Sequence, residues 1–266
     1  MQALHRFFAS PFRLFCLLLA LLVCLFGCEA QSTLEEDDGD IPVGGSVSTG
    51  KRVALTFDDG PHNLHTKAIV DELSKYGYHA TFFVVGNRVD GTDYNGAEAL
   101  RYAAEAGNEV GIHGYTHKEY YDECSDEIFA REMSMTQNAI KAILPDAEIN
   151  LMRPVGGAIS ADRVQNSPYS IILWNVDSED WKNKYQDPSA DATASAKKVE
   201  TIVDNVMENV SDGDIILLHD IYRSTYDATV IILERLHEAG YEVVTVSELL
   251  GDGRLAGCRY RSAYGG

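Results

Sequence analysis

The sequence predicts an α/β fold in which parallel strands are covered by helices, either as an open sheet or as a closed barrel. Strand-like and helix-like runs alternate between residues 51 and 250, as in repeated strand–helix units. The chain has 266 residues, 45% of them hydrophobic, which suits one domain with a sizeable core. Polar clusters follow several predicted strands, at the end of the sheet where such folds place their chemistry.

Runs of β-branched, aromatic and other apolar residues predict the strands. The run at 214–218 is the most apolar and predicts a buried strand. The predicted strands cover residues 52–57, 80–85, 109–112, 148–152, 170–176, 214–218 and 242–246.

Longer runs between these strands predict the helices. Gly107 follows one of them and Pro145 another, and both residue types commonly end helices. The predicted helices cover residues 65–76, 96–106, 126–143, 192–210 and 229–239, with a short one at 247–250.

Residues 1–28 resemble a secretory signal peptide. Arg6 and Arg13 are their formally charged residues, and an apolar run follows at 14–26. This run is short for a membrane-spanning helix, which needs ~20 apolar residues.

The end of this leader allows three readings. Residues 25–28 resemble a bacterial lipobox, in which Cys28 would be lipidated and become the mature N-terminus. Cleavage after Ala30 and an uncleaved membrane anchor are the alternatives. Each reading places the protein outside the cytoplasm, in a bacterial cell envelope, either attached to the membrane or secreted.

Two segments are predicted to flank the domain at 51–250. Residues 29–50 are acidic and then rich in Gly and Ser, which predicts a disordered tether. Residues 251–266 are also Gly-rich, which predicts a flexible C-terminal tail.

The formal net charge of −19 argues against a nucleic-acid partner, because phosphate binding needs a basic patch. It also disfavours electrostatic docking on anionic lipid. Neutral or cationic substrates fit the charge better.

The predicted domain and tail contain two cysteines, Cys124 and Cys258. An oxidising compartment would permit a disulfide between them. Two free thiols are the alternative, and the sequence does not decide between them.

The motif Thr-Phe-Asp-Asp-Gly-Pro at 56–61 places two carboxylates at the end of a predicted strand. Adjacent strand residues point to opposite faces, so Asp58 and Asp59 can serve one site only if the strand has ended. Asp59 could then bind a metal while Asp58 stays free as a base. The alternative is a polar turn, since Asp, Gly and Pro all favour turns.

A second cluster, at 113–117, follows the predicted strand 109–112 and contains His113 and His117. Two histidines and one carboxylate make a three-ligand metal site with open positions for water and substrate. The same set occurs in non-haem iron oxygenases, although their folds are usually antiparallel. Surface or structural histidines are the alternative.

Three further clusters follow predicted strands. Arg153 begins a Gly-rich turn and could hold a carboxylate ionised, while backbone N–H groups of the turn could face an oxyanion. Residues 177–181 are acidic, and His219 closes the most apolar strand as a candidate general acid or base. A plain glycine turn, an acidic loop and a core histidine are the corresponding alternatives.

These five clusters, in this order, closely resemble the polysaccharide deacetylase family, also called carbohydrate esterase family 4 or the NodB-homology domain. The resemblance covers residues 52–250, and the motif at 56–61 is highly specific to the family. It implies a single-domain distorted (β/α) barrel with about seven parallel strands. It also implies removal of N- or O-acetyl groups from polymers such as peptidoglycan, chitin and xylan.

The resemblance implies a metal centre beside a base. Asp59, His113 and His117 would bind a divalent metal, commonly Zn²⁺, with Co²⁺ or another ion possible. Asp58 would be the general base that activates water, and Arg153 would orient it.

The resemblance also implies an acid and a pocket for the acetyl group. His219 would protonate the leaving amine or alcohol, with Asp177 orienting and charging it. The backbone N–H near Gly156 would stabilise the oxyanion, and Leu217 and Trp181 would flank the acetyl methyl.

The chain departs from the family pattern at two motifs. Gly114 stands where Ser or Thr usually follows the first His, so a loop-stabilising hydroxyl is expected to be lost. Val155 and Gly156 replace a Pro and a Tyr, so an aromatic wall is expected to be missing.

The sequence therefore predicts an extracytoplasmic, metal-dependent deacetylase acting on an N-acetylated glycan, with peptidoglycan or a chitin-like polymer of N-acetylglucosamine as substrate. The alternatives are a non-catalytic glycan-binding lipoprotein, an O-acetyl esterase of the xylan type, and a hydrolase of a non-sugar amide or ester.

Overall fold

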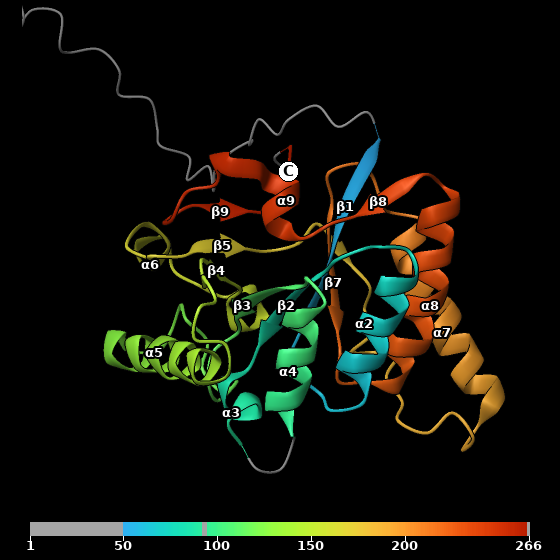
Figure 1. The fold of residues 1–266 in the computed structure, drawn as a ribbon, viewed down its shortest axis with the longest axis horizontal. Helices are drawn as coiled ribbons and strands as arrows, with labels where there is room; N and C mark the ends of the chain where they lie inside the picture. Colours follow the sequence, from blue (N-terminus) through green and yellow to red (C-terminus); the bar gives the residue numbers. More distant parts are fainter. Residues whose placement is uncertain (1–49, 92–94, 265–266) are drawn as a thin grey trace, which may run out of the picture. The chain divides into compact units, whose positions relative to one another are not determined.

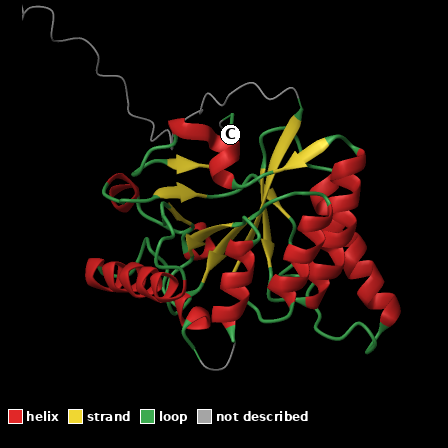
Figure 2. Ribbon diagram, in the orientation of Figure 1, coloured by secondary structure: helices red, strands yellow, loops and turns green. Residues whose placement is uncertain are grey.

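The strands form one parallel sheet that curls into a half-barrel, flanked by helices (Figures 1 and 2). The computed structural model describes residues 50–91 and 95–264; the predicted leader and nearly all of the predicted tether lie outside them. Within the described ranges, no helix is both long and apolar enough to span a bilayer.

Eight strands follow one another across the sheet in the order β6-β7-β1-β2-β3-β4-β5-β9, and β8 pairs with the first residues of β1. Each pairing of these strands is parallel. The strands are β1 (Lys51–Asp58), β2 (Thr81–Val84), β3 (Glu109–Ile112), β4 (Leu151–Met152), β5 (Ser170–Ile172), β6 (Val176–Asp177), β7 (Ile215–His219), β8 (Tyr241–Val243) and β9 (Arg259–Tyr260).

The helices occupy the connections between strands. In Figure 1, α2 and α8 lie side by side, as do α7 and α8. The helices are α2 (His65–Lys75), α3 (Gly86–Val89), α4 (Gly96–Glu105), α5 (Asp126–Ile143), α6 (Ala161–Gln165), α7 (Ala192–Met207), α8 (Arg223–Glu238) and α9 (Val246–Leu250), with 3₁₀ turns at Val155–Gly157 and Gly251–Gly253.

The alternation along β1 sorts its side chains between two cores. Leu55 and Phe57 belong to the larger apolar cluster, together with residues of the surrounding helices. Ala54 belongs to a second cluster, with residues of β4, β5, β7 and β9. Side chains at every second strand position share a face, so Asp58 points to the same side of the sheet as Ala54. That is the side on which the second cluster lies.

The predicted strand at 170–176 is two short strands, β5 and β6. The backbone changes partners here, because Leu173 N–H donates to Tyr260 and Asn175 N–H donates to Ile215. This segment therefore crosses from one end of the sheet to the other.

Part of the segment predicted as a flexible tail forms regular structure instead. Residues 259–260 form β9 against β5, and the Tyr260 side chain is fully buried. Ala263 N–H donates to Gly213 O, two residues before β7 begins. Cys258 packs beside the second apolar cluster, and both it and Cys124 are free thiols.

Candidate active site

The predicted clusters meet because the register of the strands aligns their ends. Asp58, the last residue of β1, lies opposite His219, the last residue of β7. Ile112 of β3 lies opposite Met152 of β4, so His113 and Arg153 leave the sheet side by side. Four strand ends therefore deliver their polar side chains to one place.

Asp59 adopts a left-handed conformation with φ of 72° directly after β1 ends. This turn separates its side chain from that of Asp58, as the sequence required. A Cβ at Gly60 would collide with the buried carboxylate of Asp220. Glycine is therefore the residue that this turn can accept at position 60.

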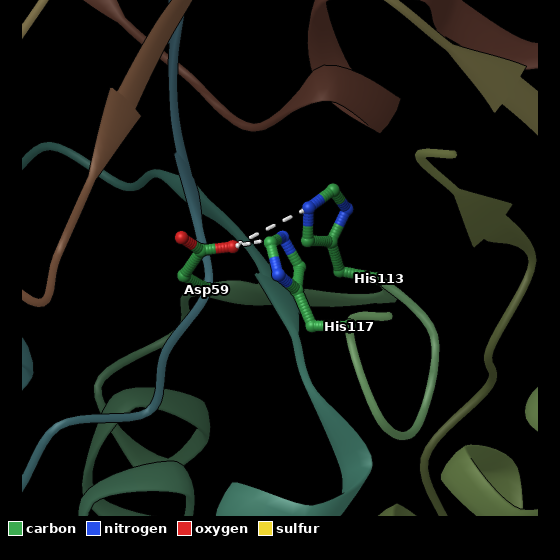
Figure 3. A group of neighbouring side chains, drawn as sticks. All are labelled: Asp59, His113 and His117. Carbon is green, nitrogen blue, oxygen red and sulfur yellow. Dashed lines mark ion pairs between the residues drawn. The ribbon is translucent and has the colours of Figure 1, made fainter. Parts of the chain in front are cut away.

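Asp59, His113 and His117 each offer one ligand atom, and these atoms lie within 4.8 Å of one another. Figure 3 shows both imidazoles facing one oxygen of Asp59. Asp59 Oδ1 is 2.9 Å from His117 Nε2 and 3.5 Å from His113 Nε2. The predicted ligand set is therefore assembled in space.

These three residues fit a divalent metal. Asp59 Oδ1 is buried and has no well-aligned hydrogen-bond donor, although two ring nitrogens lie close to it. His113 Nδ1–H donates to Arg153 O at 2.9 Å, which leaves the Nε2 lone pair facing Asp59. Such a bond fixes the tautomer of a metal-binding histidine.

The electrostatics keep Asp59 ionised. Burial tends to raise the pKa of its carboxyl, but the close His117 ring and the charges of the nearby histidines hold that pKa well below its usual range. Burial lowers the pKa of His113, which favours its neutral, metal-binding form. A carboxylate and a neutral imidazole are the protonation states that metal binding requires.

Glu132 of α5 holds the loop that carries the two histidines. Its carboxylate is buried and accepts the N–H groups of Tyr115 and Thr116, each at 2.8 Å, and the Thr116 hydroxyl at 3.0 Å. The hydroxyl of Tyr121 fills the space where a side chain at Gly114 would stand. The expected loss of loop stabilisation at Gly114 is therefore offset by Glu132.

Replacing Glu132 with Ala is expected to weaken Zn²⁺ binding at least tenfold, because two loop N–H groups lose a buried acceptor at ~1–3 kcal/mol each. Glu132→Gln keeps one carbonyl oxygen for these N–H groups and should bind nearly as wild type. Calorimetric titration of metal-free protein measures both. A Zn²⁺ affinity in Glu132→Ala equal to that of wild type would show that the loop keeps its conformation without Glu132.

Arg153 and Asp58 form a buried ion pair, with Nη1 2.8 Å from Oδ1. Arg153 is fully buried and also donates to Thr56 Oγ1, Ile172 O and Leu173 O. A guanidinium this well anchored holds the Asp58 carboxylate in one orientation. The structure thus brings these two residues together as predicted.

His219 is held by Asp180, which corrects the prediction of Asp177. His219 Nδ1 lies 2.7 Å from Asp180 Oδ1, and the backbone N–H of His219 donates to Asp180 Oδ2 at 2.7 Å. Asp180 also accepts the Thr225 hydroxyl of α8. Asp177 instead accepts Glu179 N–H, since its side chain turns back on its own loop.

The Asp180 carboxylate keeps His219 protonated at neutral pH. Burial opposes the charged imidazole, but the charge and hydrogen bond of Asp180 raise its pKa to about 10. The protonated His219 thus lies opposite Asp58 on the adjacent strand.

Three further predicted residues are near neighbours in the chain of His219, Asp180 and Arg153. Leu217 is 4% exposed and pairs with Thr56 and Asp177 on the neighbouring strands. Trp181 is 44% exposed. Gly156 is exposed in the turn after Arg153, with φ of 63°.

Sequence reasoning gave no role to several polar residues that support the site. They are buried and hydrogen-bonded across the fold: Glu132, Asp180, Asp220 and Thr225. Burial raises the pKa of Asp220 to about 7, and its carboxylate accepts the Thr66 hydroxyl. Asp180 and Asp220 carried a sequence signal, because Asp180 lies in the acidic cluster at 177–181 and Asp220 directly follows His219.

Comparisons with known proteins match this chain to one family. The family model described as polysaccharide deacetylase matches residues 46–168. The chain is 39% identical to the peptidoglycan-N-acetylmuramic acid deacetylase PdaC of Bacillus subtilis, over 75% of this chain and 38% of the relative. It is 35% identical to a peptidoglycan-N-acetylglucosamine deacetylase of Bacillus cereus, over 75% of this chain and 88% of the relative.

The chain spans less than half the length of several of these relatives, 38% of PdaC and 43% of the peptidoglycan-N-acetylglucosamine deacetylase PgdA of Listeria monocytogenes. The solved structure of PdaC from Bacillus subtilis superimposes with a TM-score of 0.67 at 38% identity, covering 76% of this chain and 92% of that one.

Two other solved structures share the fold. A family 4 acetyl xylan esterase from Clostridium thermocellum in complex with cobalt is 29% identical, with a TM-score of 0.68, covering 80% of this chain and 98% of that one. A CE4 family pseudoenzyme from Bacillus anthracis is 25% identical, with a TM-score of 0.64, covering 85% of this chain and 74% of that one. On the matched sequences and the shared barrel, this chain belongs to the polysaccharide deacetylase family.

Proposed function

We propose that this chain removes acetyl groups by hydrolysis from an N-acetylated glycan, either peptidoglycan or a chitin-like polymer of N-acetylglucosamine. The observation that carries the proposal is the adjacency of Asp58 and Asp59. A buried, Arg-paired carboxylate stands next to a carboxylate that converges with two imidazoles. Relatives named as peptidoglycan deacetylases support the substrate class.

Asp59, His113 and His117 would hold the divalent metal, with Zn²⁺ as the first candidate. When bound, the ion supplies Lewis acidity, which lowers the pKa of water to about 7 and polarises a carbonyl. A cobalt complex of a family member is consistent with a divalent ion here.

The protein's own residues divide the proton transfers between them. Asp58, held by Arg153, accepts a proton from the attacking water. His219, charged through Asp180, donates a proton to the leaving nitrogen, so the products are acetate and a free amine. An acid and a base of opposite protonation state at one pH are what this reaction needs.

Three further residues are proposed to contact the acetyl group. The backbone N–H near Gly156 would donate to the developing oxyanion. Leu217 and Trp181 would offer apolar surface to the methyl group. The proposed site of action is the cell envelope, with the leader either cleaved or kept as an attachment through Cys28 or an apolar anchor.

An O-acetyl esterase of the xylan type is the second candidate, because the acetyl xylan esterase matches over 80% of this chain. A non-catalytic glycan-binding protein is a further alternative, since the family includes a pseudoenzyme of the same fold. Against it stand the intact Asp58–Arg153 pair and the His219–Asp180 pair.

Acetate release from a substrate panel tests the proposal. Zn²⁺-loaded protein is incubated with peptidoglycan, chitin oligomers, acetylated xylan and a small acetylated amide. Release from the first two is expected to exceed release from the others. A preference for xylan would favour the esterase, and binding without release from any glycan would contradict the proposed hydrolysis.

A further inference from the structure

Two aromatic rings pack on the glycine turn that follows Arg153. A Cβ at Gly156 would lie 3.0 Å from Tyr120 Cε1, and a Cβ at Gly157 would lie 3.2 Å from Trp174 Cη2. Real side chains seldom approach so closely, so these rings occupy the space that side chains at 156 and 157 would need. The Tyr120 ring comes from the preceding loop, the one that carries His117.

The neighbour of Tyr120 fixes its direction. Tyr121 is fully buried, forms a parallel bridge with Ile159, and donates its N–H to Ala158 O. Successive residues of an extended chain point to opposite sides, so Tyr120 faces outward where Tyr121 faces inward. Tyr120 is accordingly 54% exposed.

The backbone around Tyr120 is held firmly. Its carbonyl accepts the N–H of Cys124 at 3.1 Å, and the next carbonyl, of Tyr121, accepts Arg163 Nη1 at 2.6 Å. Arg163 also donates to Cys124 O. An exposed ring on a rigid support can contact a ligand without a large loss of conformational entropy.

The position of this ring relates it to the proposed reaction. Tyr120 lies shortly after His117 in the chain, and Gly156 lies shortly after Arg153, on the adjacent strand ends of β3 and β4. The ring therefore stands at the rim of the candidate active site. A sugar ring presents an apolar C–H face, and flat aromatic side chains are well suited to pack on such a face.

We propose that Tyr120 is a specificity-determining residue, whose ring stacks on a sugar of the acetylated glycan. This proposal rests on the proposed function and deepens it. The sequence led us to expect no aromatic side chain at position 156; the Tyr120 ring supplies one beside Gly156 from the neighbouring loop. The preferred ligand is then an oligosaccharide rather than a small acetylated compound.

The test measures glycan binding and turnover separately. Zn²⁺-loaded wild type, Tyr120→Ala and Tyr120→Phe are assayed for acetate release from chitin or peptidoglycan oligomers and from a small acetylated ester. Binding of the same oligomers is measured by calorimetry in the Asp58→Asn background. Tyr102→Ala is the control, because Tyr102 is 41% exposed in the last turn of α4, which leads to the far end of β3.

Tyr120→Ala is expected to raise KM and the dissociation constant for oligomers about tenfold, the effect of ~1.4 kcal/mol of lost contact. Its kcat, its Zn²⁺ affinity and its rate on the small ester should stay near wild type. Tyr120→Phe should restore oligomer affinity, because the ring and not the hydroxyl makes the contact. Tyr102→Ala should change none of these values.

The outcomes separate this proposal from the proposed function. Unchanged oligomer affinity in Tyr120→Ala, or an equal loss on oligomer and small ester, would overturn the role of Tyr120 alone. Oligomer binding that depends on Tyr120 but yields no acetate would support the subsite and contradict the hydrolysis. Absence of both binding and release in the wild type would contradict both.

Discussion

Replacing Asp58 with Asn is expected to lower kcat for acetate release by about 10²–10⁴-fold, the usual contribution of a general base. Asn keeps the size of the side chain and one acceptor for Arg153 Nη1, but it cannot take a proton from water. Asp58 is not one of the three converging ligands, so the affinity for Zn²⁺ should stay within about tenfold of wild type.

Metal titration also serves as the control for folding in this variant. Arg153 is fully buried, and removing the charge of its partner leaves that guanidinium less well compensated. A variant that binds one equivalent of Zn²⁺ has kept the strand ends in place. Wild-type turnover by such a variant would show that Asp58 is not the base.

Replacing Asp180 with Asn is expected to cause the second large loss, about 10²-fold or more in kcat at neutral pH. The charge and hydrogen bond of Asp180 raise the pKa of His219 to about 10 despite burial. Without that charge, the pKa of His219 falls and less of the acid is protonated. The alkaline limb of the pH–rate profile should therefore move to lower pH.

Asp177→Asn is the matched control, because Asp177 lies three residues earlier in the same loop. Its carboxylate accepts Glu179 N–H rather than a ring nitrogen of His219. This variant should keep the alkaline limb close to that of wild type. A shifted limb in Asp177→Asn, with a normal one in Asp180→Asn, would return the role to Asp177.

The same pair predicts how stability depends on pH. A histidine whose folded pKa is raised stabilises the fold fully below its unfolded pKa, and this contribution is lost as pH rises through the folded value. For His219 the window runs from 6.5 to about 10. The free energy of unfolding lost in Asp180→Asn should accordingly be largest at or below pH 6.5 and smaller near pH 10, as measured by denaturant titration.

The main parts of the site could be predicted because they follow strands. The ends of parallel strands meet at one edge, so Asp58, His113, Arg153 and His219 could be expected together from their positions alone. The helix Asp126–Ile143 was also predicted at its bounds, with Pro145 marking its end; the structure adds that Ser125 caps its start.

Other parts depend on contacts between distant segments. The choice between Asp177 and Asp180 depends on a turn in which Glu179 has a φ of 53°. The support of the histidine loop comes from Glu132, on a different helix. Hydrophobic patterning reports burial of apolar faces, and it does not show which polar partner a loop will find.

The sequence missed one strand and predicted one helix too short, because both depend on contacts with distant segments. The strand β9 lies in a Gly-rich segment, and its two residues become a strand only by pairing with β5. The helix α8 begins at Arg223 rather than at the predicted residue 229, because the polar side chains of Ser224 and Thr225 are buried in the fold. Polar residues at a helix start resemble a loop until their partners are known.

The most direct test of the account is acetate release by metal-free protein during titration with Zn²⁺. No release is expected after chelation, and release should recover until it saturates at one equivalent of Zn²⁺ per chain. Asp59→Ala, which removes the central carboxylate of the cluster, should bind Zn²⁺ weakly and stay inactive at that stoichiometry. Full release by chelated wild type, or by Asp59→Ala, would contradict a metal centre built from Asp59, His113 and His117.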